Sequence, residues 1–170
     1  KQKVAIVTAA SKGIGAACAT QLSSEGYKLV LMSRSDSLFA LCDQLNARPL
    51  QGSIEDENDI ARLVAFTYEK YGRIDAVVCN TGHASKGSLL SLTDSDWEKG
   101  MNLLLMNVIR LAKFIGPIMA KQKGGAFVNI STFGAKEPSL SFPISSVIRA
   151  AVSSYCKLFA SELGHPNVRM

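Results

Sequence analysis

The sequence predicts a single α/β domain, built on a doubly wound parallel sheet with helices on both faces. Short apolar runs such as Val4–Val7 are unbroken by polar residues, which is typical of strands buried on both faces. These runs alternate with longer segments of helical pattern, and such alternation favours parallel strands joined by right-handed crossovers. The composition, 47% hydrophobic and 19% charged over 170 residues, is ordinary for one globular domain covering residues 1–170.

The first strand, Val4–Val7, leads into a turn of small residues and then into a helix that Gly13-Ile14-Gly15 opens. Small residues let the backbone turn tightly and let a ligand approach the amides closely. The helix presents its unpaired N–H groups and positive dipole end at this turn, which suits an anion. A strand, a glycine turn and a helix in this order favour a pyrophosphate site. A plain connecting turn is the alternative.

The remaining elements repeat the alternation. Gly26 ends the first helix, and Gly72 ends a later one that has acids in its first turn. The further predicted strands are Lys28–Met32, Pro49–Gln51, Ile74–Cys79, Ala126–Ile130 and the start of a sixth at Asn167–Met170. The further predicted helices are Ser37–Asn46, Asp56–Tyr71, Asp94–Ala120 and Ser145–Leu163. A capping box is predicted at Ser95-x-x-Glu98, near the start of the long helix.

Composition disfavours several classes of partner. The net charge is +5, but the basic residues are scattered, so nucleic-acid binding is not expected. Charge-free runs fall short of a membrane span and no leading segment suggests a signal peptide, so we expect no membrane. The four cysteines lie far apart without a C-x-x-C pair. They are interpreted as core residues in a reducing compartment, which predicts a cytoplasmic protein and no metal site.

Four stretches carry a family resemblance. The turn T-A-A-S-K-G-I-G resembles the T-G-x-x-x-G-I-G turn of short-chain dehydrogenases/reductases, with Ala9 at the first glycine. Cys79-Asn80-Thr81-Gly82 is similar to the family's N-N-A-G. Two longer stretches, G-G-A-F-V-N-I-S-T at residues 124–132 and A-A-V-S-S-Y-C-K-L-F-A-S-E-L at residues 150–163, extend the similarity over nearly the whole chain. The chain is thus identified as a divergent member, resembling 3-oxoacyl-acyl-carrier-protein-reductase-like proteins.

The resemblance implies a Rossmann-like fold that continues beyond Met170 with a substrate lid and a last strand, so the C-terminal part of the fold is missing here. It also implies an oxidoreductase that uses NAD(P)(H) on the carbonyl or hydroxyl group of a small-molecule substrate. The positions matched to cofactor binding are Ser11, Lys12, Gly13, Ile14, Gly15, Ser33, Arg34, Ser53, Ile54, Asn80, Thr81, Gly82, Ile130 and Arg149.

The residues after the second strand bear on the choice of cofactor. An acid there would accept from the ribose 2′-hydroxyl and repel a 2′-phosphate. This chain has Arg34 instead, with Lys12 in the first turn. Two cations beside the adenosine ribose favour NADP(H) over NAD(H) by charge pairing. The alternative is that both are solvated surface cations.

The family's catalytic set is replaced at most positions. Its tyrosine falls on Ser145, its lysine on Arg149, its serine on Thr132 (with Ser131 beside it) and its asparagine on Leu104. No tyrosine here has a lysine four residues later. A serine hydroxyl is far less acidic than a phenol and is a poor proton donor near neutral pH. Thr132, Ser145 and Arg149 are therefore the candidate catalytic residues of an altered site. The alternative is a catalytically silent relative that binds the nucleotide as a regulator or scaffold.

Two helices predict self-association. Met101–Ile109, in the long helix, is uncharged and apolar over almost its whole circumference, and the last helix, Ser145–Leu163, is similar. A helix that is apolar all round is buried on more than one side. In the resembled family these helices pair with their copies in a four-helix bundle. We therefore expect a homodimer or homotetramer, against the alternative of burial within one chain.

Overall fold

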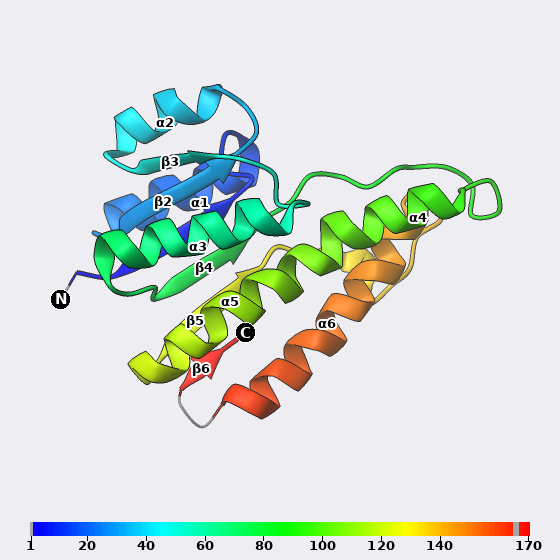
Figure 1. Cartoon of the computed structure of the whole chain (residues 1–170). Coiled ribbons are helices and arrows are strands. Elements are labelled where there is room, and N and C mark those ends of the chain that lie inside the picture. The colour runs from blue at the N-terminus through cyan, green and yellow to red at the C-terminus, as the bar shows by residue number, and fades with distance from the viewer. Residues whose placement is uncertain (1, 165–166) are drawn as a thin grey trace.

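The computed structural model describes residues 2–164 and 167–170, and in these residues six parallel strands form one sheet in the order β3-β2-β1-β4-β5-β6 (Figure 1). The strands are β1 (Val4–Thr8), β2 (Lys28–Ser33), β3 (Arg48–Gln51), β4 (Ala76–Cys79), β5 (Gly125–Asn129) and β6 (Val168–Arg169). The strand order reverses between β1 and β4, where a doubly wound sheet opens a crevice at its carboxyl edge. The predicted fold class is confirmed.

Helices cover both faces of the sheet (Figure 1). They are α1 (Gly13–Ser24), α2 (Ser37–Leu45), α3 (Glu57–Tyr71), α4 (Asp94–Met101), α5 (Asn107–Gln122) and α6 (Pro143–Leu163). Because neighbouring strand residues point to opposite faces, Ile6 packs in a core with α3, α5 and α6. Ala5 and Val7 pack in a second core with α1 and α2. The unbroken apolar character of β1 follows from this double burial.

The second core ends before β5. Phe127 is buried in the core under α5 and α6, whereas Val128, on the opposite face, is 51% exposed. That face of β5 is therefore open in the residues that the structure describes.

Helix ends lie close to their predicted positions. Asn46, after α2, adopts a left-handed conformation, as does Gly72 after α3. The Asp56 carboxylate caps α3 by accepting from the amide of Asn58 at 2.8 Å. The predicted capping box at Ser95-x-x-Glu98 is wrong. The box is formed two residues earlier by Thr93 and Asp96, which have the same spacing of a hydroxyl and an acid.

The predicted long helix is interrupted by a π-helical segment, η1 (Asn102–Met106), between α4 and α5. The buried Asn107 side chain explains the interruption: its Nδ2 donates to the carbonyl of Leu103. In an α-helix that carbonyl would accept from the backbone N–H of Asn107, and such competition distorts a helix.

One helical stretch in the described part of the chain, Asp94–Gln122, is long and apolar enough to cross a membrane by length and composition alone. Its most apolar window has a mean hydropathy of 1.6 and is 44% buried inside the protein. Leu111, Ile115 and Met119 lie in the main core. A core helix passes the same test, so the length and composition of one such helix are weak evidence for a membrane span.

Candidate functional site

The turn after β1 has a strained and tightly packed backbone. Ala9 has φ +46°, in the left-handed region that costs a non-glycine residue about 1–2 kcal/mol. This explains why glycine suits that position. Gly13 has φ +57°. A Cβ on Gly15 would lie 2.5 Å from the Ala9 carbonyl oxygen and 2.7 Å from Asn80 Nδ2, so only glycine lets α1 approach the turn this closely.

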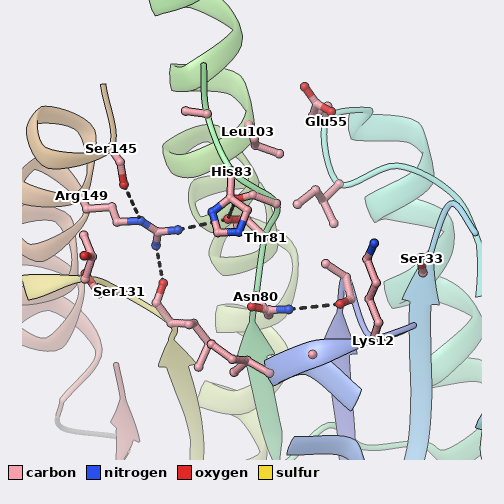
Figure 2. Close-up of a pocket in the computed structure, with 18 of the residues that line it drawn as sticks. Lys12, Ser33, Glu55, Asn80, Thr81, His83, Leu103, Ser131, Ser145 and Arg149 are labelled. Atoms are coloured by element: carbon pink, nitrogen blue, oxygen red, sulfur yellow. Dashed lines mark hydrogen bonds between the residues drawn. The ribbon is translucent and has the colours of Figure 1, made fainter. Parts of the chain in front are cut away.

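Hydrogen bonds join this turn to the end of β4. Asn80 Nδ2 donates to the carbonyl of Ala9 at 3.1 Å (Figure 2). The buried Thr8 hydroxyl donates to the Asn80 carbonyl at 2.8 Å and accepts from the Asn80 amide at 3.0 Å. Asn80 therefore fixes the loop after β4 against the glycine turn.

The start of α1 is arranged to receive an anion. Lys12 is the N-cap residue, and no side chain caps the first turn. The amides there keep free donors beside the positive end of the helix dipole. The Ser33 hydroxyl, at the end of β2, donates to the Ser11 hydroxyl at 2.9 Å. This bond ties the second strand to the rim of the turn.

A cavity of about 920 Å³ runs along the carboxyl ends of the strands, from this turn to the first turns of α6 (Figure 2). Most residues predicted for the site line it: Ser11, Lys12, Gly13, Ile14, Ser33, Arg34, Ile54, Asn80, Thr81, Gly82, Ile130, Thr132, Ser145 and Arg149. Residues from both ends of the chain thus meet in one space.

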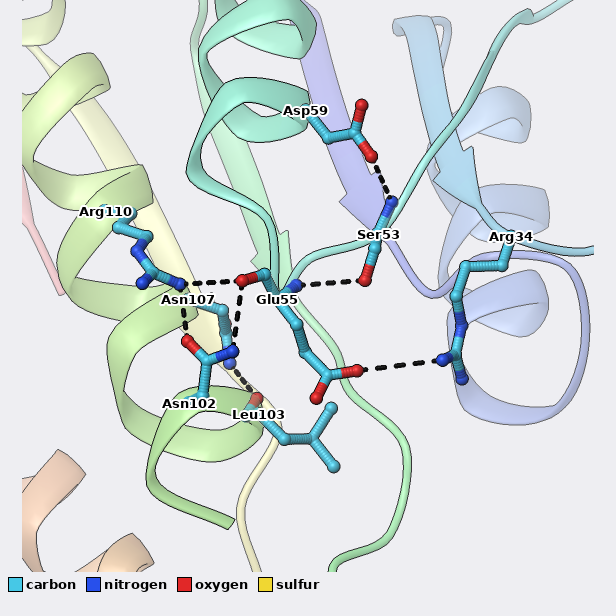
Figure 3. A network of polar contacts seen from close by, with 8 residues as sticks. All are labelled: Arg34, Ser53, Glu55, Asp59, Asn102, Leu103, Asn107 and Arg110. Carbon is cyan, nitrogen blue, oxygen red and sulfur yellow. Dashed lines mark hydrogen bonds and ion pairs between the residues drawn. The ribbon is translucent and has the colours of Figure 1, made fainter. Parts of the chain in front are cut away.

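Two predicted residues do not line the cavity. Gly15 lies behind the turn, where it permits close packing. The Ser53 amide donates to the Asp59 carboxylate at 2.8 Å, and its hydroxyl accepts from the Glu55 amide at 3.2 Å. Ser53 therefore stabilises the connection from β3 to α3 (Figure 3).

Sequence reasoning missed Glu55. This residue lines the cavity, and its carboxylate lies 3.7 Å from Nη1 of Arg34. Its backbone carbonyl accepts from Asn102 Nδ2 and from Arg110 Nη1, both at 3.1 Å (Figure 3). The π-helical segment and α5 thus hold the loop that presents Glu55. The sequence signal that could have identified Glu55 is a charged residue just beyond the third strand.

The loop after β4 contributes further residues. His83 and Lys86, which were not predicted from the sequence, also line the cavity. Ser131, beside Thr132, lines it as well, and Thr132 Oγ1 accepts from the Gly134 amide at 3.4 Å.

Arg149 is fixed by bonds to three separate segments (Figure 2). Its Nε donates to the Ser145 hydroxyl at 3.3 Å, one turn earlier in α6. Nη1 donates to the carbonyl of Ile130, after β5, and Nη2 donates to the Thr81 hydroxyl at 3.2 Å, after β4. Burial lowers the pKa of Arg149 below its ordinary value. The guanidinium is therefore held at the junction of β4, β5 and α6.

Leu104 points away from this chemistry. It is 1% exposed and packs with Ile144 and Ile148 of α6. Among the residues described, no tyrosine lines the cavity, and no group of three or more His, Cys, Asp or Glu side chains is placed to hold a metal ion.

A parallel sheet with a reversal of strand order, a glycine turn at a helix start and a cavity at the strand ends define a Rossmann-like α/β protein. The chain belongs to the short chain dehydrogenase family, whose sequence model matches residues 3–170. This is a family of oxidoreductases that bind NAD(P).

Individual relatives agree with this assignment. A 3-oxoacyl-[acyl-carrier-protein] reductase of Synechocystis is 30% identical over 98% of this chain and 70% of its own length. Human dehydrogenase/reductase SDR family member 4 is 32% identical over 99% of this chain and 63% of its own. The crystal structure of L-sorbose reductase from Gluconobacter frateurii, complexed with NADPH and L-sorbose, superposes with a TM-score of 0.91 at 28% identity, covering 99% of this chain and 67% of that one. The chain therefore spans about two thirds of these relatives.

Proposed function

We propose that this protein binds NADP(H) in the cavity and transfers a hydride between it and the carbonyl or hydroxyl carbon of a small molecule. The observation that carries the proposal is the single cavity joining the glycine turn to the Ser145–Arg149 pair. The free amides at the start of α1 fit a pyrophosphate, and the close packing behind Gly15 leaves the turn open to it.

Two cations support the preference for NADP(H). Lys12 and Arg34 line the half of the cavity that adjoins the turn, and both are exposed enough to pair with a phosphate. Glu55 partly offsets this preference for NADP(H), because its carboxylate lies beside Arg34. The balance favours NADP(H), since two cations face one acid.

The Ser145–Arg149 pair supplies the chemistry of this chain at the reacting carbonyl. Bound NADPH would supply the hydride. Arg149 Nε donates to the Ser145 oxygen, so the hydroxyl hydrogen of Ser145 stays free to donate to a substrate carbonyl. The guanidinium lies beside Ser145, so its positive charge would stabilise negative charge that develops on an oxygen bound to that hydroxyl. The pair stabilises negative charge on the carbonyl oxygen better than it donates a proton to that oxygen. Loss of the general acid lowers the reaction rate by ~100- to 10,000-fold.

A catalytically silent, nucleotide-binding regulator or scaffold is the second candidate. It is favoured by Leu104, whose packing against Ile144 and Ile148 leaves no polar group at the asparagine position. It is also favoured by the serine in place of the phenol. Both candidates require the nucleotide site.

Titration with NADPH and NADH, followed by a panel of carbonyl substrates, tests the proposal. We expect NADPH to bind more tightly than NADH and turnover on simple ketones to be slow. Ser145→Tyr with Arg149→Lys supplies a phenol beside a lysine, and should raise turnover more than the two single changes together, because such groups act as a unit. Failure to bind either nucleotide would refute the proposal, and brisk turnover by the unmodified protein would refute the assignment of an impaired proton donor.

We also propose that the chain assembles as a homodimer or homotetramer in the cytoplasm. Support for assembly comes from apolar side chains left exposed on α4 and α6, namely Met101, Val147 and Leu158. Support for the compartment comes from the four cysteines, which are all free.

A further inference from the structure

The charge of Arg149 is uncompensated within the protein. Its partners are a serine hydroxyl, a threonine hydroxyl and a backbone carbonyl, which are all neutral. In the part of the chain that the structure describes, Arg149 forms no ion pair with any carboxylate. Arg149 is partly buried, and burial without a counter-charge is unfavourable for a cation. This burial lowers the pKa of the group. The site therefore lacks a negative charge.

No other wall of the cavity provides that charge. Glu55 is the one acid among the described lining residues, and it lies beside Arg34. Figure 2 shows Glu55 across the cavity from Arg149. The lining cations are Lys12, Arg34, Lys86 and Arg149. Under the proposed function, Lys12 and Arg34 bind the phosphates of the nucleotide, so Lys86 and Arg149 have no anionic partner among the described lining residues.

The guanidinium also has donors to spare. Arginine carries five N–H donors, two of them on each terminal nitrogen. Arg149 uses its Nε hydrogen and one hydrogen on each terminal nitrogen, so one hydrogen on each terminal nitrogen is left. A planar cation with a free donor on each terminal nitrogen can bind the oxygens of a carboxylate. Ribose hydroxyls can also accept such hydrogens, but they are neutral and leave the charge unbalanced.

From this geometry we infer that the substrate of this site carries a carboxylate, which Arg149 binds, with Lys86 at the cavity wall adding to the attraction. The inference rests on the proposed function and deepens it by naming an oxo acid, or the matching hydroxy acid, as the substrate class. Arg149 thereby has a role that a lysine serving a ribose does not have. Its position is preset by Thr81, Ser145 and Ile130, so no reorganisation is needed when the acid binds.

The test compares acids with their neutral amides of the same shape: pyruvate with pyruvamide, acetoacetate with acetoacetamide, and levulinate with levulinamide. Binding is measured by calorimetry or ligand-observed NMR, with and without saturating NADP⁺. For the pair of best size, we expect the acid to bind about tenfold more tightly than the amide, as a hydrogen bond to a charged group implies. Arg149→Met should bring this ratio to about one, while Arg149→Lys should keep part of it.

Lys157→Met is the matched control, since this exposed lysine lies two turns further along the same helix, and it should leave the ratio unchanged. Thermal melting tests whether each variant is folded. If Arg149→Met does not fold, the acid-to-amide affinity ratio of the unmodified protein decides whether the inference holds. Equal binding of acid and amide in all three pairs, or a preference that survives Arg149→Met, overturns the inference. A preference lost in Lys86→Met but kept in Arg149→Met also overturns it. Failure of NADP⁺ to bind, with the acid preference intact, refutes only the proposed nucleotide function.

Discussion

The ion pair between Arg34 and Glu55 predicts how the choice between NADPH and NADH can be shifted. Arg34 Nη1 lies 3.7 Å from Glu55 Oε2, with the two side chains 75% and 31% exposed. A 2′-phosphate that pairs with Arg34 must compete with the Glu55 carboxylate for the guanidinium, or displace that carboxylate by charge repulsion. Glu55→Gln removes this competitor and keeps the size of the side chain. Arg34→Ala removes the cation itself.

The exposure of the pair sets the magnitude. Two unit charges about 4 Å apart interact by about 1 kcal/mol in water, and exposed pairs measure about 0.2–1 kcal/mol. Glu55→Gln should therefore tighten NADPH binding by up to about fivefold. The same change replaces a carboxylate acceptor with the weaker, neutral amide oxygen, so hydrogen bonds to the ribose hydroxyls of NADH should weaken slightly. Arg34→Ala should weaken NADPH by about tenfold, the lower range for a hydrogen bond to a charged group, and leave NADH nearly unchanged.

Fluorescence titration at fixed ionic strength measures both nucleotides on each variant. Arg48→Ala is the control, because this exposed arginine begins β3 and so lies at the opposite edge of the sheet from the cavity. The gain from Glu55→Gln should disappear in an Arg34→Ala background and shrink at high salt. Equal losses of NADPH and NADH affinity in Arg34→Ala would show that Arg34 does not recognise the 2′-phosphate, and the reasoning would fail.

Two further predictions concern stability and assembly. The pKa of Asp75 is below its ordinary value because, although burial raises it, hydrogen bonds from Arg73 and the Val4 amide outweigh this effect. The stability that Asp75 contributes is therefore present above its unfolded pKa and lost as pH falls through its folded pKa. Asp75→Asn should cost about 2 kcal/mol near neutral pH and less near pH 3 in urea unfolding, and an equal cost at both would contradict this account. Leu158, on α6, is 67% exposed, so Leu158→Asp should yield a monomer in sedimentation with its melting temperature nearly kept. By contrast Val152 is buried in the core, and a charge there would unfold the chain.

Much of the fold could be predicted because its signals are local. An unbroken run such as Val4–Val7 requires burial on both faces, and the two cores on either side of β1 provide it. Gly72 and Asp56 mark the ends of α3 by backbone freedom and capping chemistry that act within a few residues. The π-helical segment was not predictable in this way. It depends on whether the Asn107 amide turns back to the Leu103 carbonyl or outward, and both choices are compatible with the same apolar pattern.

The site was predictable where it follows strand ends and was missed where it depends on distant contacts. Asn80 and Arg34 come directly after strands, and the carboxyl ends of parallel strands meet at one edge. Glu55 is placed by bonds from Asn102 and Arg110, which lie 47 and 55 residues further along the chain. Only the assembled structure shows that this loop faces Arg34, and hence that the end of the cavity lined by Lys12 and Arg34 contains an acid.

The positions matched to the family's catalytic set are coupled by packing. Ile144 and Ile148, which enclose Leu104, directly precede Ser145 and Arg149 in α6. An asparagine at position 104 would place its amide in this apolar cluster, where an unsatisfied polar group costs about 1–3 kcal/mol. The apolar contact between the helices and the polar pair facing the cavity therefore belong to the same two turns of α6. A proton relay cannot be routed through Leu104, which has no group to bond a water. Under the proposed function, any proton consumed in turnover must then reach Ser145 from the cavity side, where Ser131, Thr132 and His83 are among the polar lining residues.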